Sequence, residues 1–264
     1  MNPLRVAARR VGLRREHMRS ARVMVVRRAL STWPRRRPPA VAGRILCYHG
    51  VGTPAWGYND ITPAQLRRQL ELAMRRGYRF VPAEDIARTG GTPGDLAVTF
   101  DDGLRSIGED AAPILAELGV PWTVFVVSGW ASGEGWADPE LFLGWEELTE
   151  LARRGATLGS HSVSHPNFGR LDEDAARHEM VESRRAIEAA TGLSIDTFAI
   201  PLGQSGDWSE ACSTIAAEAG YRLVYAQAAE TRWPGTVPRS FITGFDDDRV
   251  FLAALDGAFD RWEE

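Results

Sequence analysis

The sequence predicts an α/β fold in which helices cover a parallel β-sheet. From residue 43 onward, short β-rich runs alternate with longer segments whose apolar residues have helical spacing. At least six such alternations occur without an internal sequence repeat. The chain has 264 residues, of which 44% are apolar and 25% charged, as is typical of soluble globular proteins. A closed barrel accommodates this number of units better than an open sheet, but the pattern alone leaves both architectures open.

The expected elements follow from local signals along the chain. The segment Arg-Ile-Leu-Cys-Tyr-His at 44–49 predicts a buried strand. The helix at 62–77 begins with the N-cap signal Thr62 before Pro63 and ends at Gly77. Further strands are expected at 78–81, 96–100, 122–127, 157–159, 197–200 and 222–225, with an additional segment at 237–242. Further helices are expected at 84–88, 106–118, 146–154, 172–191, 209–219 and 247–262.

Composition excludes several kinds of chemistry. All 31 basic residues are arginine, so the chain has no lysine for a Walker phosphate loop or a Schiff base. Cys47 and Cys212 are the two cysteines, and they lie far apart without a C-x-x-C spacing. This pattern argues against a disulfide framework and against a cysteine-based zinc site, although one disulfide remains possible.

The first 42 residues differ in charge from the rest. Residues 1–37 contain 12 arginines and one acid, Glu16, whereas 38–264 contain 19 arginines and 34 acids. We therefore divide the chain into a basic head, 1–42, and a globular domain, 43–264. We expect the head to be disordered or peripheral, and attraction to an anionic membrane surface is the alternative. Its longest apolar run, 23–26, is too short to span a bilayer or to serve as a secretory signal.

Polar residues follow four of the expected strands. Tyr48 and His49 close the first, and the residues at 101–103 close another. A pair of histidines follows the strand at 157–159, and a Pro-Leu-Gly turn at 201–203 closes a fourth. Because catalytic groups of parallel α/β folds lie at the carboxyl ends of strands, we expect these residues to share one face of the sheet.

Two of these strand ends together suggest a metal site. Asp101 and Asp102 are adjacent and precede a glycine, and His161 and His165 lie four residues apart. Taken singly, the aspartates could be a turn with a helix cap, and the histidines a chance surface pair. Combined, Asp102 and the two histidines form a set that leaves coordination positions open, as in catalytic zinc sites. Asp101 is then placed to take a proton from bound water.

These motifs resemble those of the polysaccharide deacetylase family. The family is also called carbohydrate esterase family four, and its domain the NodB-homology domain. The segments that carry the resemblance are Thr-Phe-Asp-Asp-Gly at 99–103, His-Ser-x-x-His at 161–165 and Phe-x-x-Pro-x-Gly at 198–203. Spacers at 60–81 and 145–155 also resemble the family pattern, so the resemblance covers roughly residues 43–250 in the expected order.

The resemblance implies a deformed (β/α) barrel and metal-dependent removal of acetyl groups from N-acetylated, or O-acetylated, sugars. Asp101 would be the base, and Asp102, His161 and His165 would hold one divalent ion, with zinc expected and cobalt, nickel or manganese as alternatives. The metal would polarise the acetyl carbonyl and activate its water. The oxyanion would be held by the metal and by a backbone N–H in the turn at Pro201 and Leu202, which we expect to be that of Leu202.

The chain departs from the commoner family pattern at two positions. Many members carry an arginine that orients the catalytic aspartate where this chain has Ala199, and Arg239 is our candidate substitute, with an ordinary surface arginine as the alternative. Many members also supply a general acid from a histidine near the C-terminus, but this chain has none beyond His178. The pair Tyr48 and His49 resembles a subgroup whose acid lies at the N-terminal end of the domain. Histidine readily donates a proton near neutral pH, so His49 is our candidate acid, with a packed structural histidine as the alternative.

Nine tryptophans are many for this length, and some are candidates for stacking on sugar faces. Those expected in loops after strands are Trp56, Trp130, Trp136 and Trp208, and we take Trp208 as a substrate-binding candidate. Trp122 and Trp145 are expected in the core.

The leading functional prediction is therefore a metal-dependent sugar deacetylase whose partner is an acetylated glycan. One alternative keeps the metal site but acts on a small non-sugar amide, and another is a non-catalytic carbohydrate-binding protein. Nucleic acid is not expected, because the acidic domain would repel phosphate. Without a recognisable signal peptide in the given chain, we expect a cytoplasmic location or the cytoplasmic membrane face.

Overall fold

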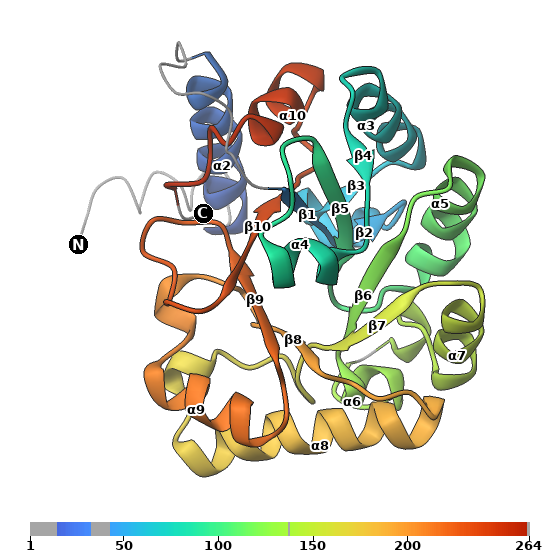
Figure 1. Ribbon diagram of the computed structural model, residues 1–264, viewed down its shortest axis with the longest axis vertical. Coiled ribbons are helices and arrows are strands. Elements are labelled where there is room, and N and C mark those ends of the chain that lie inside the picture. Colours follow the sequence, from blue (N-terminus) through green and yellow to red (C-terminus); the bar gives the residue numbers. More distant parts are fainter. Residues whose placement is uncertain (1–14, 33–42, 137, 263–264) are drawn as a thin grey trace.

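The computed structural model describes residues 15–32, 43–136 and 138–262, with side chains from residue 21 onward. Within this part of the chain, seven parallel strands close a barrel, because β1 pairs with β5 on one side and with β10 on the other (Figure 1). The barrel strands are β1 (Arg44–Tyr48), β5 (Asp95–Phe100), β6 (Trp122–Val126), β7 (Thr157–Ser160), β8 (Thr197–Ala199), β9 (Leu223–Gln227) and β10 (Val237–Phe241). The short strand β4 (Arg79–Phe80) pairs with the start of β5, and β2 (Gly50–Val51) pairs with β3 (Asp60–Ile61). The predicted (β/α) barrel is confirmed.

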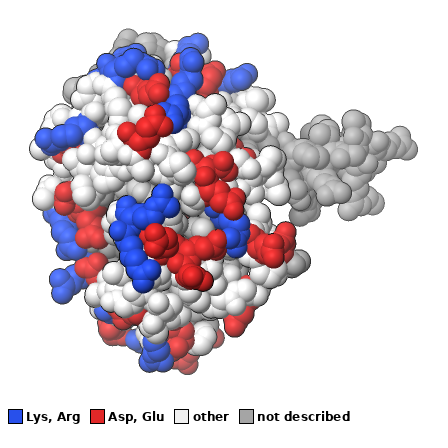
Figure 2. Space-filling model, turned by 90° about the vertical axis from the view of Figure 1, so that its right-hand side faces the viewer, with Lys and Arg blue, Asp and Glu red and all other residues white. Residues whose placement is uncertain are grey.

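Helices surround the barrel on its outside (Figure 1). They are α2 (Arg15–Thr32), α3 (Pro63–Arg75), α4 (Ala83–Thr89), α5 (Ala112–Leu118), α6 (Ser128–Ala131), α7 (Trp145–Arg153), α8 (Glu173–Thr191), α9 (Glu210–Glu218) and α10 (Asp248–Leu255). Thr62 caps α3 by accepting a hydrogen bond from the Gln65 N–H, as its position before Pro63 predicts. Arg67 of α3 and Glu117 of α5 form an exposed ion pair, and Figure 2 shows acidic and basic side chains next to one another on this side of the molecule.

Large and small side chains pack together inside the barrel. The rings of Phe125 and Tyr225 have centroids 5.0 Å apart, and Ala97 and Ala199 belong to the same buried cluster. Gly159 has no room for a side chain, because a Cβ atom would lie 2.6 Å from the Phe125 ring. Helix α4 contributes Ala83 and Ile86 to this cluster. The site therefore has a closed, packed floor.

Most predicted elements match the structure, and three need comment. The segment at 237–242, which the sequence leaves without an assigned type, forms the barrel strand β10. The helix expected at 106–118 begins with a π-helical turn, Ile107–Ala111, before α5. The last helix is shorter than expected, because α10 ends at Leu255 and Gly257 adopts φ 77°, a conformation suited to glycine.

The basic head is expected to be disordered or peripheral. Residues 15–32 are not disordered, because they form helix α2, which packs against α10 on the outside of the barrel. The physical reason is a buried ion pair. Arg27, 2% exposed, donates 2.7 and 2.5 Å hydrogen bonds to both carboxylate oxygens of the buried Asp246, and its guanidinium lies 4.3 Å from the Phe259 ring centroid. Val23 is also buried. The rest of the head, 1–14 and 33–42, lies outside the described residues. No helix in the described ranges combines the length and apolar character needed to cross a membrane.

We predict that Arg27→Met destabilises the protein. Asp246 would keep its hydrogen bonds from Thr243 but lose its countercharge while buried, which costs about 3–5 kcal/mol. Urea unfolding should therefore show a loss of this size. Removal of residues 1–37 should leave a folded domain, because the barrel strands begin at Arg44. Arg22→Met is the control, because Arg22 is exposed on the same helix. Equal stability of both variants would show that α2 does not dock through Arg27.

Candidate active site

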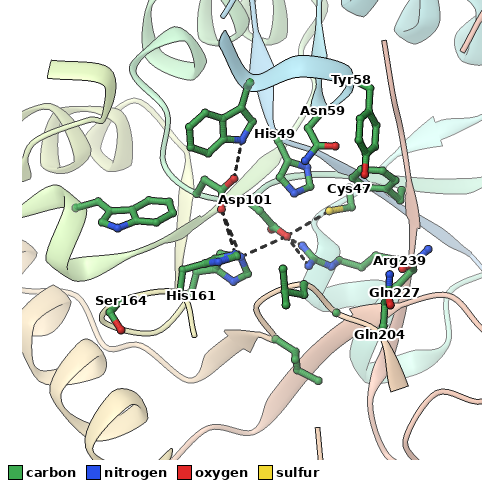
Figure 3. Close-up of a pocket in the computed structure, with 18 of the residues that line it drawn as sticks. Cys47, His49, Tyr58, Asn59, Asp101, His161, Ser164, Gln204, Gln227 and Arg239 are labelled. Atoms are coloured by element: carbon green, nitrogen blue, oxygen red, sulfur yellow. Dashed lines mark hydrogen bonds and ion pairs between the residues drawn. The ribbon is translucent and has the colours of Figure 1, made fainter. Parts of the chain in front are cut away.

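A cavity of about 580 Å³ opens at the carboxyl ends of the barrel strands (Figure 3). Seven of the nine residues predicted for the site line it, from β10 and from the segments that follow β1, β5, β7 and β8. They are His49, Asp101, Asp102, His161, His165, Leu202 and Arg239. The structure thus brings together residues that are as far as 190 positions apart in the sequence, as the strand-end argument predicts.

Asp102, His161 and His165 converge on one point. The Oδ1 atom of Asp102 lies 3.7 Å from Nε2 of His161 and 3.6 Å from Nε2 of His165. This oxygen is buried, yet it accepts no hydrogen bond from any described residue. His161 Nδ1 lies 2.8 Å from the Ala199 carbonyl, which can only accept, so Nδ1 carries the proton and Nε2 a lone pair. The three residues thus offer one carboxylate oxygen and one imidazole nitrogen from each histidine. These ligand atoms fit a divalent metal ion.

Glu179 of α8 holds the loop that carries the two histidines. Its Oε2 accepts hydrogen bonds from the backbone N–H groups of Val163 and Ser164, at 2.8 and 2.9 Å. Inside the same loop, Ser162 Oγ accepts the His165 N–H at 2.9 Å. The spacing of His161 and His165 is therefore fixed by a folded loop and not by a helix.

Two tryptophans support the metal-ligand set from the side. Trp56 donates its indole N–H to Oδ2 of Asp102 at 3.0 Å, which leaves Oδ1 free to face the histidines. Trp130 stacks on the His165 ring at a centroid distance of 5.5 Å. Trp136, 44% exposed, packs against both tryptophans. Three of the four tryptophans considered from sequence thus form one wall of the cavity.

Asp101 forms a bidentate ion pair with Arg239. The two guanidinium nitrogens of Arg239 donate to the carboxylate oxygens at 2.5 and 2.7 Å, and both side chains are buried. Burial alone would raise the pKa of Asp101, but the Arg239 guanidinium holds it well below its usual value. Burial also lowers the pKa of His161, to about 4, although the nearby Asp101 opposes this shift. Asp101 is therefore an ionised carboxylate beside a neutral imidazole.

Backbone strain is concentrated at this site. Among the described residues, the non-glycine residues with positive φ are Asp102, Ser162, His165 and Leu202, with values from 57° to 71°. Each such conformation costs about 1–3 kcal/mol and persists where the surrounding structure holds it. Three of these residues line the cavity, and the fourth lies in the histidine loop.

Trp208 does not belong to the site, and its prediction as a substrate contact is wrong. It is buried against Phe168 and Phe198, and its indole N–H donates to Ser213. A loop tryptophan and a core tryptophan look the same in sequence, because loop position does not determine which way the ring packs. Pro201 is buried and does not line the cavity, although Leu202 beside it does.

Sequence reasoning missed other residues that line the cavity. They include Cys47, Tyr58, Asn59, Gln204, Gln227 and Phe241. Cys47 could have been found, because residues two apart on a strand point to the same face and His49 was already a candidate. Both cysteines are buried and unpaired, so the disulfide that the sequence left open is not formed.

Comparison with known proteins finds a matching family and related sequences. A model of the polysaccharide deacetylase family matches residues 89–224, just over half of the chain. The putative polysaccharide deacetylase YxkH of Bacillus subtilis is 26% identical over 128 residues, which cover 48% of this chain and 43% of that protein. A chitooligosaccharide deacetylase of Sinorhizobium fredii is 25% identical over 150 residues, covering 56% and 64%. The chain thus spans less than two thirds of the length of these two relatives.

Two solved structures share the fold. The deacetylase PplD of Streptococcus pyogenes, solved in complex with acetate, is 21% identical and superposes with a TM-score of 0.70, covering 83% of this chain and 99% of that chain. IcaB from Ammonifex degensii is 23% identical with a TM-score of 0.66, covering 83% and 98%.

We predict that Trp56→Phe weakens metal binding by about 10–100-fold. The substitution keeps an aromatic ring in the cluster but removes the hydrogen bond that orients Asp102, and such supporting contacts typically have this effect. Competition between the protein and a zinc chelator measures the change. Trp136→Phe is the matched control, because Trp136 packs in the same cluster and donates no hydrogen bond to Asp102. Equal affinities in the two variants would contradict the orienting role.

Proposed function

The chain belongs to the polysaccharide deacetylase family, and on that premise we propose that it hydrolyses the acetamido groups of N-acetylated sugars or polysaccharides with the help of one divalent ion. The observation that carries the proposal is the convergence of Asp102, His161 and His165 on a buried carboxylate oxygen that no described residue satisfies. An ionised carboxylate, Asp101, lies next to this set.

Asp102, His161 and His165 would hold the ion, and zinc suits this mixture of imidazole and carboxylate ligands, with cobalt, nickel and manganese as alternatives. When bound, the ion would act as a Lewis acid on the acetyl carbonyl and make water acidic enough to lose a proton near neutral pH. The chain itself supplies the groups that move protons and stabilise charge.

Asp101 would accept the proton of the attacking water. Each carboxylate oxygen has two lone-pair positions, so the bonds from Arg239 leave room for a second partner. The oxygen of the water forms a bond to the acetyl carbon, and the negative charge moves to the carbonyl oxygen. The backbone N–H of Leu202 would stabilise that charge, since Leu202 lines the cavity in a turn of fixed, left-handed conformation.

His49 would give a proton to the departing amine as the bond between carbon and nitrogen breaks, releasing acetate. It lines the cavity after β1, and its ring lies edge-on to Phe241 at a centroid distance of 5.2 Å. Its buried Nδ1 has no hydrogen-bond partner among the described residues. A packed structural histidine would be expected to have one.

A sugar substrate is favoured over a small amide by the aromatic lining of the cavity. The wall of Trp56, Trp130 and Trp136 presents apolar rings on which the face of a sugar could stack. The relatives named as chitooligosaccharide deacetylases support the same choice. The intact set of ionisable residues argues against a purely carbohydrate-binding protein.

We further propose peripheral contact with anionic lipids through the basic head. Arg22 and Arg28 are exposed on α2, and each arginine near an anionic surface contributes about 1 kcal/mol. Because anionic lipids concentrate in the cytoplasmic leaflet, this contact would place the enzyme at the cytoplasmic membrane face.

The first test is acetate release from N-acetylated oligosaccharides, lipid-linked sugars and small amides, with stoichiometric zinc. We expect release from a sugar substrate, and we expect Asp101→Asn to keep bound metal but lose turnover, because the amide cannot accept the proton. Metal content is measured on the same samples. Near-full activity of Asp101→Asn would exclude Asp101 as the base, and release only from small amides would favour the alternative substrate class.

The second test separates the acid role of His49 from packing. His49→Ala should keep metal and lose about 10²–10⁴ in kcat on an N-acetylated sugar. The loss should be much smaller on an aryl acetate, whose phenolate departs without a proton. His178→Ala is the control, because His178 is exposed on α8. Equal losses of His49→Ala on both substrates would contradict the acid role.

A further inference from the structure

A second set of metal-ligating atoms lies beside the first. Cys47, His49 and Asp101 each offer one atom, and these atoms all lie within 4.8 Å of one another. All three residues line the same cavity, and the two sets adjoin where Oδ2 of Asp101 comes within 3.8 Å of Nε2 of His161 (Figure 3). The second set contains the only thiol in the cavity lining, which makes it chemically different from the first.

Strand geometry brings this second set together. Cys47 lies in β1 and His49 directly follows that strand, so the two residues, two positions apart, both face the cavity. Tyr48 between them is packed in the surrounding core and donates a hydrogen bond to Gln69. Strand β5 lies next to β1 in register, with Cys47 opposite Thr99. Asp101 follows two residues later, and Sγ of Cys47 lies 3.4 Å from its Oδ2.

The ligand types select a borderline-soft cation. Thiolate and imidazole together suit zinc, cobalt and cadmium, whereas magnesium and calcium prefer sites built from oxygen alone. His49 also brings an unsatisfied atom, because its Nδ1 is buried and has no hydrogen-bond partner in the described ranges.

We propose that Cys47, His49 and Asp101 bind a second thiophilic divalent ion, and that this ion inhibits the enzyme. Binding itself does not depend on the deacetylase activity, whereas inhibition rests on the function proposed above. An ion held by Asp101 and His49 occupies both the base and the acid of that reaction, so the water proton has no acceptor and the amine no donor. The thiol proton of Cys47 passes to the solvent when the sulfur binds the ion.

The same surroundings make this second site weaker than the first. The Arg239 guanidinium neutralises Asp101 and repels an added cation, whereas Asp102 pairs with no arginine among the described residues. Cys47 is also buried, and the ion must displace its thiol proton in order to bind. We therefore expect the second site to fill only after the first, at metal concentrations above stoichiometry.

Titration of the metal-free protein with Co²⁺ tests the proposal without requiring turnover. A thiolate bound to Co²⁺ gives a sulfur-to-metal charge-transfer band in the near ultraviolet, which a site of imidazole and carboxylate ligands cannot give. We expect no such band with the first equivalent and its appearance with the second. Elemental analysis of the bound metal counts the equivalents.

Cys47→Ser and Cys47→Ala should abolish the band while keeping the first equivalent of bound metal. Cys212→Ser is the matched control, because Cys212 is the only other cysteine and is buried in α9 beside Ser209. It should keep the band. Absence of the band in the unmodified protein, its persistence in Cys47→Ser, or its appearance with the first equivalent would each overturn the proposal.

Inhibition is measured as the ratio of acetate release at excess zinc to release at one equivalent. We expect this ratio to fall in the unmodified protein and in Cys212→Ser, and to stay near one in Cys47→Ser. A thiolate band in a protein that releases no acetate from any substrate would leave the second site standing and refute the proposed function. Acetate release by a protein that binds only one equivalent of metal would support the proposed function and refute the second site.

Discussion

The ion pair between Arg239 and Asp101 is the interaction on which the rest of the site depends. Both partners are buried, so removing either one would leave an uncompensated charge at a cost of about 3–5 kcal/mol. The guanidinium of Arg239 lies 5.0 Å from the ring centroid of Phe125 inside the barrel, and Gly159 leaves the space that this ring occupies. The pair keeps Asp101 ionised and oriented. On the function proposed above, Arg239 would orient Asp101 in place of the arginine that many family members carry at the position of Ala199.

The N-terminal helix is joined to the site through β10. Arg27 donates to the backbone carbonyl of Phe241, at the end of the strand that carries Arg239, as well as to Asp246. Phe241 in turn contacts His49, the proposed acid. The segment with the most unusual composition is therefore not a separate appendage over residues 15–32. It holds the carboxyl end of one barrel strand through a charge that is buried on docking.

Local patterns predicted the strands and helices because each is encoded within a short stretch of sequence. The motifs at strand ends predicted the site for a related reason, since every parallel strand delivers its last residues to the same face. What could not be predicted depends on partners distant in sequence. The docking of α2 requires Asp246, which lies 219 residues from Arg27, and nothing near Arg27 distinguishes it from the other arginines of the head. The burial of Trp208 requires Phe168 and Phe198 in the same way.

The tryptophan wall and the metal-ligand set share one side chain. Trp56 packs on Trp136, the most exposed member of the wall, and donates to Asp102. A ligand that stacks on the wall therefore presses on a ring whose opposite end orients a metal ligand. The hydrogen bond from Trp56 and the positive-φ backbone at Asp102 together orient the Asp102 carboxylate toward the two histidines. A small displacement of Trp56 therefore moves Oδ1 of Asp102 relative to His161 and His165. Changes that displace the Trp56 ring should thus alter metal binding, whereas Trp136→Phe, which leaves the Trp56 hydrogen bond to Asp102 in place, should not.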